Sequence, residues 1–456
     1  MQQSTGEAVD LLVIGAGMAG LSAAARAVED GASVVLVEKG RATGGSAAYA
    51  GFVWTAPTVE VMREVNPDAD ERLARWLPEE YDGAVEWIRS LGVHVGELVT
   101  VLGYGRGRAT DLANYLLACE RMVRDRGELL LRATTRRLVF EDGAVVGAEV
   151  EPAGEEPRTI RARSTLLATG GFAGDPDLRV EHIGPAARDL PLRANPHSLG
   201  DGMRLAAEAG AALSAPGAGF YGHLIPSNVS YTDPLEFTDL TFYHSEHGVL
   251  LNLEGRRFYD ETLGDHLSTL AVLDQPESRA LLITDQRVHE QWMLTPYVEG
   301  AETLDKFQLA YKRGARAAIA DDIEEFEALP EEWGYLGGAA RDALAEFNEQ
   351  CRNGNPAPGR ELDGAPLVDP PYYVIEVIPA ITFTFTGLRI DERARVLGGD
   401  GAPIPGLLAA GADAGGVFHR AYAGGLAAAL VFGLRAAATA TQGVVAGSRT
   451  GPRSPA

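Results

Sequence analysis

Residues 10–40 of this chain read DLLVIGAGMAGLSAAARAVEDGASVVLVEKG, and this stretch decides the fold. The apolar run at residues 11–14 is typical of a fully buried strand, and the run at 33–37 predicts a second strand. Between them, residues 21–29 are rich in alanine, which favours a helix. The stretch therefore predicts a strand, a helix and a second strand, the unit from which parallel sheets are built.

Three glycines join the first strand to the helix with the spacing G-x-G-x-x-G. Gly15 allows a tight turn, Gly17 lets a pyrophosphate approach the backbone, and Gly20 lets the helix pack closely on the strand. The free N–H groups and positive dipole end of the helix face the phosphates. Glu38 ends the second strand, where an acid accepts hydrogen bonds from a ribose hydroxyl. We predict a dinucleotide-binding site; the alternative is a glycine turn in another α/β unit.

Length and composition limit the class of protein. A chain of 456 residues has room for two or three domains, and its 46% hydrophobic content is that of a soluble globular protein. No apolar run reaches the roughly 18 residues that a membrane span needs. Residues 1–8 lack the charged-then-apolar pattern of a signal peptide. The two cysteines, Cys119 and Cys351, exclude a disulfide framework and have no metal-ligand spacing. We therefore expect a cytoplasmic protein without a metal site.

The net charge of −24 bears on partners. A phosphate backbone would be repelled, so we do not expect nucleic-acid binding. A small polyanionic substrate would need a local cationic site to overcome the same field.

The pattern changes along the chain. After Glu38, small residues at 42–46 and 50–51 would let a loop lie against a large flat ligand. Near residue 211 aromatic strands begin, followed by acidic segments that we predict to be helices, such as 318–329 and 339–348. Alternating β residues return at 372–390, and a small-residue helix is predicted at 425–440. We expect a first domain at 1–215, an inserted α+β domain at 216–345, a return segment at 346–442 and a disordered tail at 443–456.

With these motifs, residues 9–440 resemble the flavoprotein superfamily of fumarate reductases, succinate dehydrogenases, ketosteroid dehydrogenases and tricarballylate dehydrogenases. Beside the N-terminal fingerprint, the resemblance is carried by GGS at 44–46, ATGG at 168–171, GDG at 200–202, GRRFYDE at 255–261, PPYY at 370–373 and GG at 424–425. It implies a Rossmann-type FAD-binding domain in an α/β fold, with an inserted α+β capping domain. It also implies substrate held between cap and isoalloxazine, and hydride transfer between flavin N5 and a substrate carbon.

The resemblance also implies which residues bind FAD. They are Gly15, Gly17, Met18, Ala19, Gly20, Glu38, Lys39, Gly44, Gly45, Ser46, Gly51, Thr135, Ala168, Thr169, Gly170, Asp201, Gly411, Asp413, Gly425 and Leu426. The helix from 425 would aim its positive end at the flavin edge where reduction places negative charge. The alternatives are close helix packing by small residues and, for 169–171, an ordinary strand-to-helix turn. Where the family has A-A-G-E, residues 409–412 of this chain read A-A-G-A, so Ala412 replaces the glutamate. The contact with the ribityl chain of FAD then passes to Asp413 or is lost.

Departures from the relatives are informative. Succinate dehydrogenases tether FAD through a histidine that residues 45–49 lack, so we expect non-covalent FAD. Fumarate reductases have an arginine proton donor in N-E-I-T-T-R-D; the matching stretch, DETLGD at 260–265, has no arginine. The H-H-T-M-G-G motif of fumarate reductases corresponds to TFTFTG at 382–387 in this chain. Their arginine before Gly-Gly is replaced by Tyr422. With three groups for a dicarboxylate missing, the motifs are closer to those of tricarballylate and ketosteroid dehydrogenases.

Desaturation next to a carbonyl needs donors on the carbonyl oxygen and a base near Cα. Tyr422 is the best candidate donor, by its match to the tyrosine that precedes the flavin helix in ketosteroid dehydrogenases. Arg420 could hold a carboxylate, His223 could be a base or donor, and Thr384 could contact substrate or FAD. Each residue also has an alternative without a role in the reaction. Tyr422 could be a core tyrosine, Arg420 a surface arginine and His223 a loop histidine. Thr384 could be a threonine of a half-buried strand.

Three functions compete. The first is an FAD-dependent dehydrogenase that desaturates a C–C bond next to a carbonyl or carboxylate of a small molecule and passes electrons to an unknown acceptor. The second is a C=C reductase of the same fold. The third is a flavin-binding electron carrier or a degenerate flavin-binding protein, as Ala412 suggests.

Overall fold

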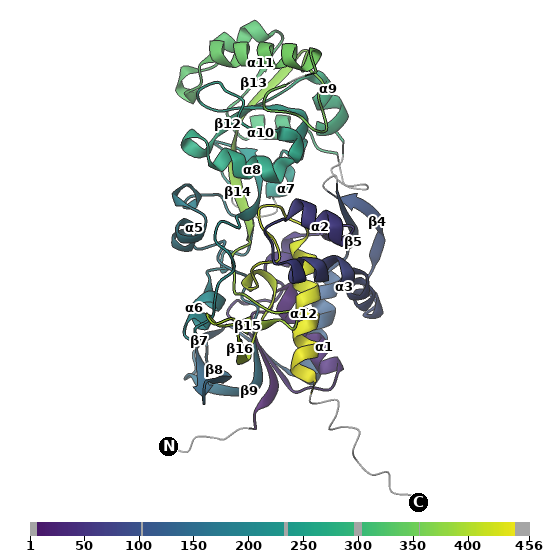
Figure 1. Cartoon of the computed structure of the whole chain (residues 1–456), viewed down its shortest axis with the longest axis vertical. Helices are drawn as coiled ribbons and strands as arrows, with labels where there is room; N and C mark the ends of the chain where they lie inside the picture. Colours follow the sequence, from purple (N-terminus) through teal and green to yellow (C-terminus); the bar gives the residue numbers. More distant parts are fainter. Residues whose placement is uncertain (1–6, 102–103, 232–235, 296–302, 355, 443–456) are drawn as a thin grey trace, which may run out of the picture. The chain divides into compact units, whose positions relative to one another are not determined.

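The computed structural model describes residues 7–101, 104–231, 236–295, 303–354 and 356–442. They divide into two compact units (Figure 1). The first comprises Met1–Leu178, Ala194–Gly219 and Phe383–Ala456, and the second comprises Arg179–Arg193 and Phe220–Thr382. Residues 346–382, expected in the return segment, thus fall in the second unit, because strand β14 (Tyr372–Thr384) pairs with β12 and β13 there. The expected tail at 443–456 lies outside the described residues.

A parallel sheet forms the centre of the first unit, and β1 (Val9–Ile14) lies in its middle. It pairs in parallel with β2 (Val34–Glu38) on one side and β9 (Arg158–Leu167) on the other. The sheet continues through β6 (Glu128–Leu131) beside β2 and β16 (Pro403–Ala409) beside β9. The predicted strands at 11–14 and 33–37 are confirmed, and the side chains of residues 11–14 and 34–37 are buried, as a sheet covered on both faces requires.

Helices α1 (Met18–Glu29) and α12 (Gly425–Thr441) pack together in this unit (Figure 1). Both are predicted correctly. A Cβ at Gly433 would lie 2.6 Å from the Ala19 carbonyl oxygen, so the small residues of α12 do provide close helix packing.

The other elements of the first unit surround this centre. Antiparallel pairs are added to the large sheet by β7 (Ala133–Glu141), β8 (Ala144–Pro152) and β15 (Arg395–Leu397). A separate antiparallel sheet has the order β3 (Phe52–Thr55), β5 (Gly105–Thr110), β4 (Val95–Val101). The remaining helices are α2 (Val59–Val65), α3 (Glu71–Ser90), α4 (Leu112–Arg126) and α6 (Asp201–Ala207). Helix α5 (Pro176–His182) spans the boundary between the units in the chain.

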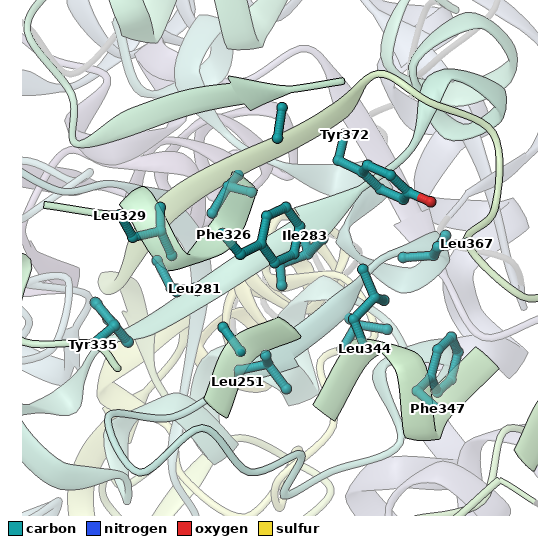
Figure 2. Packing of buried hydrophobic residues seen from close by; sticks show 14 of the residues in the cluster. Leu251, Leu281, Ile283, Phe326, Leu329, Tyr335, Leu344, Phe347, Leu367 and Tyr372 are labelled. Atoms are coloured by element: carbon teal, nitrogen blue, oxygen red, sulfur yellow. The ribbon is translucent and has the colours of Figure 1, made fainter. Parts of the chain in front are cut away.

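An antiparallel sheet organises the second unit, in the order β10 (Phe220–Pro226), β14, β12 (Ala280–Thr284), β11 (Val249–Leu251), with β13 (Ala317–Ala320) also on β14. Alternate side chains of these strands enter separate apolar clusters on its two faces. Figure 2 shows one, in which Leu281 and Ile283 pack with Leu344 and Phe347 of α11 (Gly337–Arg352). The other cluster takes the intervening residue, Leu282.

The expected helix at 318–329 is wrong. The structure has β13 there, followed by a short 3-10 turn at Ile323–Ala328. Pairing of β13 with β14 outweighs local preference, and the Asp322 side chain accepts from the Glu324 N–H at the start of the turn. The predicted helix at 339–348 is confirmed within α11, and the predicted β segment at 372–390 is a strand only as far as Thr384. The remaining helices are α7 (Glu236–Leu240), α8 (Asp265–Leu273), α9 (Gln286–Val288) and α10 (Lys306–Lys312).

Among the residues that the structure describes, no helix has the length and apolar character needed to cross a membrane, and no group of three or more side chains is suited to a metal ion.

Candidate functional site

The turn between β1 and α1 has the conformation that the glycine spacing predicts. Gly15 has φ +101°, and a Cβ there would lie 2.3 Å from the Ala168 carbonyl oxygen. A Cβ at Gly20 would lie 1.9 Å from the Gly15 carbonyl oxygen. At Gly17, by contrast, a Cβ would meet no heavy atom within 4 Å. The backbone is therefore tightly packed on one side and open at Gly17, the residue expected to face a pyrophosphate.

Glu38 and the loop after it adjoin this turn. The Glu38 carboxylate accepts hydrogen bonds from the N–H groups of Ala16, at 2.9 Å, and Gly40, at 2.6 Å. Gly17 forms a parallel bridge with Gly44, and φ is positive at Gly44 and Gly45. Glu38 is thus fixed in place beside the glycine turn.

Asp413 follows β16 and lies against the loop that ends β9. Its carboxylate is fully buried: Oδ2 accepts from the Thr169 N–H at 2.5 Å, and Oδ1 accepts from Thr169 Oγ1 and the Gly171 N–H, both at 3.0 Å. Burial raises the pKa of Asp413, and the hydrogen bonds oppose that rise. The carboxylate therefore supports the Ala168–Thr169–Gly170 loop, and its expected contact with a ribityl chain stays a prediction.

Further expected cofactor residues are fixed by contacts within the first unit. Lys39 Nζ and Asp201 Oδ2 form an ion pair at 2.5 Å. Ser46 Oγ accepts from the Asn195 N–H at 3.0 Å, and the carbonyl of exposed Gly51 accepts from the Thr110 N–H at 2.8 Å. The other expected residues lie at the ends of helices: Met18 and Ala19 in the first turn of α1, Gly411 beside Ala19, and Gly425 and Leu426 at the start of α12.

These residues fit FAD. Most of the expected segments follow the carboxyl ends of β1, β2, β9 and β16, the edge at which open parallel sheets bind ligands. Thr135 Oγ1 and Thr384 Oγ1 are among several buried hydroxyl oxygens that have no hydrogen-bond partner within the described chain. Since buried polar groups are normally paired, these hydroxyls are suited to hydrogen-bonding a ligand.

Tyr422 lies in an aromatic cluster at the start of α12. Its ring contacts Trp54 edge-on, with centroids 5.3 Å apart, and also packs near Phe383, Phe385 and Phe418. A Cβ at Gly425, the first residue of α12, would lie 3.0 Å from the Tyr422 hydroxyl oxygen. The hydroxyl thus lies at the positive end of a 17-residue helix, whose first N–H groups have no partner within the helix.

Arg420 differs from Tyr422 in its exposure to solvent. It is exposed, and its φ of +70° is unusual for a residue other than glycine. Its backbone N–H donates to the Ala218 carbonyl oxygen at 2.7 Å, which holds this conformation. The exposure agrees with the surface alternative, and the carboxylate-binding role stays a prediction.

His223 lies on β10 in the second unit and is 1% exposed. Its Nδ1 is 2.6 Å from Oδ2 of Asp265, the first residue of α8, and both side chains are buried. Asp265 Oδ1 accepts from the Leu224 N–H at 2.9 Å. Burial lowers the pKa of His223, and Asp265 acts against that fall. Instead of a loop histidine, the structure has a buried histidine–aspartate pair.

Sequence reasoning missed three residues here. Asp265 ends the stretch 260–265 and occupies the place of the arginine in N-E-I-T-T-R, so this departure from the relatives is the sequence signal for the acid. Trp54 and Tyr104 join the cluster around Tyr422, and the Tyr104 hydroxyl donates to the Tyr422 carbonyl oxygen. The aromatic pattern of 52–54 is the only sequence signal for Trp54.

Comparisons with known proteins identify the family of the chain. The family described as FAD binding domain matches residues 10–426. The vinyl phenol reductase of Lactiplantibacillus plantarum is 28% identical, over 91% of this chain and 92% of that protein. A fumarate reductase (cytochrome) of Shewanella frigidimarina is 28% identical, over 90% of this chain and 73% of that protein. The fold matches the crystal structure of 3-ketosteroid-Δ4-(5α)-dehydrogenase from Rhodococcus jostii, with a TM-score of 0.73, 22% identity and coverage of 96% and 98%.

Proposed function

Because this chain belongs to the FAD binding domain family and is an FAD-dependent oxidoreductase, we propose that it desaturates a C–C bond next to a carbonyl or carboxylate group. The substrate is a small organic molecule. When bound, FAD supplies the oxidant that accepts a hydride from the substrate carbon. The residues of this chain hold the cofactor, polarise the carbonyl group and remove a proton.

The glycine turn and the loop on Asp413 hold FAD without a covalent link. The open backbone at Gly17 suits the pyrophosphate, and Glu38 suits the adenosine ribose. Residues 45–49 contain no histidine that could be flavinylated.

One observation carries the proposed reaction: the Tyr422 hydroxyl lies at the start of α12. Removal of a proton from Cα places negative charge on the neighbouring carbonyl oxygen. A hydroxyl donor at the positive end of a helix stabilises such a charge, and it acts mainly in the transition state. The surrounding aromatic rings exclude water, which strengthens the donor.

Reduction of a C=C bond is the second candidate, and the names of the vinyl phenol and fumarate reductases favour it. Desaturation is preferred because DETLGD at 260–265 contains no arginine that could donate a proton. It is also preferred because burial lowers the pKa of His223, which favours a neutral imidazole that accepts a proton over an imidazolium that donates one.

Tyr422→Phe tests the role of the hydroxyl, because the ring and its packing remain. The measurement is anaerobic, rapid-mixing reduction of the flavin by the most reactive member of a panel of saturated ketones and carboxylic acids. We expect the rate to fall by about 10²–10³ while FAD affinity stays near wild type.

Tyr115→Phe is the matched control, because it removes a buried hydroxyl of α4 that bonds Ser22 Oγ at 2.6 Å. Its flavin reduction rate is expected to stay within a few-fold of wild type. If Tyr422→Phe and Tyr115→Phe reduce their flavins equally fast, Tyr422 is not the donor and the proposed chemistry loses its support.

We also propose that the protein acts in the cytoplasm. The support is the state of its cysteines, Cys119 and Cys351, both of which are free thiols. Fractionation of native cells, followed by detection of the chain, tests this proposal; recovery from an oxidising compartment would contradict it.

A further inference from the structure

We propose that His223 and Asp265 form a proton-transfer pair, in which His223 Nε2 removes the substrate Cα proton and Asp265 positions and stabilises the imidazole. This inference rests on the proposed function and names its base. It assigns to Asp265 a positioning role in the place where fumarate reductases have an arginine.

The hydrogen bonds of the pair set the protonation state of His223. Asp265 Oδ1 accepts from the Leu224 N–H, and Oδ2, 2.6 Å from Nδ1, is the acceptor for an Nδ1–H group. In the neutral imidazole, a proton on Nδ1 leaves the lone pair on Nε2. Nε2 is buried and has no hydrogen-bond partner in the part of the chain that the structure describes. An unpaired buried nitrogen is costly, which indicates that it serves a ligand.

The surroundings of the pair favour the neutral form of His223. The Tyr221 and Tyr243 rings lie edge-on to the imidazole, with centroids 4.7 and 5.1 Å away. Arg193 and Lys306 oppose an added positive charge on His223, and burial lowers the pKa of Lys306 to about 8. The charged and titratable groups around the pair are Tyr221, Tyr243, His266, Arg193, Lys306, Asp239 and Glu246.

Three other histidines among the described residues of the second unit have carboxylate partners, and they differ from His223. His182 Nε2 lies 3.8 Å from Glu181, whose side chain is 67% exposed. His247 Nδ1 is 2.8 Å from Asp363, but its Nε2 lies 3.5 Å from a second carboxylate, Glu246, and its pKa is raised. His289 bonds through Nε2 to Asp305, whose side chain is 28% exposed, and its ring is stacked on Tyr373. Only at His223, among these four pairs, are both partners buried from solvent with Nε2 left as the open nitrogen.

The proposed step is balanced. The Nε2 lone pair takes the proton from Cα, and the electron pair of that C–H bond forms the new C–C π bond. The hydride leaves Cβ for the oxidant assigned above, so the substrate loses two electrons and two hydrogens. The imidazolium that results is stabilised by the Asp265 carboxylate at 2.6 Å.

The first experiment needs no substrate. It is long-range ¹H–¹⁵N NMR of the FAD-bound protein with ¹⁵N-labelled histidine, in which His223→Gln identifies the His223 signals among the nine histidines. We expect a neutral Nδ1–H tautomer that persists below pH 6. Asp265→Asn should shift this signal toward the Nε2–H tautomer, and Asp363→Asn, the matched control, should leave it unchanged. A wild-type Nε2–H tautomer, or no change in Asp265→Asn, would overturn the proposal.

The second experiment is anaerobic flavin reduction by the panel compound that reduces wild type fastest, followed from pH 5 to 9. The wild-type rate should fall only below pH 6, as the base becomes protonated. Asp265→Asn and His223→Gln should each lose about 10²-fold or more at pH 7, with little change in substrate Kd. Asp363→Asn should keep the wild-type rate.

The outcomes separate the two proposals. His223→Gln can still donate to Asp265, so it tests the base even if Asp265→Asn fails to fold. If His223→Gln stays within threefold of wild type, the proton-transfer role is wrong although desaturation stands. If no panel compound reduces the wild-type flavin while the NMR signature is present, the proposed function fails and the assigned protonation state of the pair stands.

Discussion

At the scale of single residues, Asp413 shows how a buried charge can be stable. Its carboxylate has no exposed surface, yet it accepts three hydrogen bonds from Thr169 and Gly171. A buried carboxylate without such partners would be strongly unfavourable. Asp413 therefore links the segment after β16 to the loop after β9, at an edge of the sheet expected to face FAD.

We predict that Asp413→Ala destabilises the protein and weakens FAD binding. The change leaves the Thr169 and Gly171 N–H groups without acceptors, and each buried unpaired group costs about 1–3 kcal/mol. Chemical denaturation of the FAD-bound protein and titration of the apoprotein with FAD measure the two effects. Asp400→Ala, which alters an exposed turn, is the control. Equal stability of the two variants would show that the Asp413 hydrogen bonds are not needed.

The glycine turn was easier to predict from residue types than the histidine–aspartate pair. Gly15, Gly17 and Gly20 have positions fixed by local backbone geometry, so their spacing alone was informative. His223 and Asp265 are 42 residues apart, and only tertiary structure brings them together. No spacing rule could have found the pair.

At the scale of elements, the contact between α1 and α12 depends on missing side chains. Gly20 lies close to the Gly15 carbonyl, and Gly433 lies close to Ala19. These contacts fix the start of α1 and bring α12 near the same sheet. The packing alternative for the small-residue helix is therefore compatible with the expected role of its positive end.

We predict that Gly433→Ala destabilises the protein, because its Cβ would lie 2.6 Å from the Ala19 carbonyl oxygen and force α12 away from α1. The expected cost is about 1–3 kcal/mol. Gly83→Ala in α3 is the matched control: its Cβ would meet nothing within 4 Å, so the better helix propensity of alanine should add about 0.5–1 kcal/mol. Thermal unfolding distinguishes the two. A Gly433→Ala protein that unfolds at the same temperature as Gly83→Ala, or at a higher one, would contradict the packing.

Elements also show where sequence patterns fail. The strand–helix–strand unit at 9–38 was predictable because buried apolar runs, glycines and a helical composition agree within thirty residues. The segment at 318–329 was mistaken for a helix because its acidic residues favour one locally, whereas pairing with β14 makes Ala317–Ala320 a strand. Non-local pairing of this kind cannot be predicted from the sequence of the segment alone.

At the scale of the whole molecule, the chain returns to its first unit after a long insertion. Sequence composition predicted that the inserted domain ends at residue 345, whereas the second unit extends to Thr382. The composition of residues 346–382 would suit the strands and loops of either unit. The pairing of β14 with β12 and β13 assigns most of that strand to the second unit. The family match across residues 10–426 includes both units, as expected for a flavoprotein with an inserted domain.

We predict that FAD is bound without a covalent link, because residues 45–49 offer no histidine to carry it. Acid precipitation of the purified yellow protein should release all of the flavin into the supernatant. Flavin absorbance that remains with the washed, denatured pellet would contradict this prediction.

The most direct test of the central claim is anaerobic mixing of the oxidised holoprotein with the panel of saturated ketones and carboxylic acids. The account predicts that at least one compound bleaches the flavin absorbance, and that mass spectrometry finds it lighter by two hydrogens, with the new C=C bond next to the carbonyl. If no saturated compound bleaches the flavin, while α,β-unsaturated compounds reoxidise the chemically reduced protein, desaturation is contradicted and the protein is a C=C reductase.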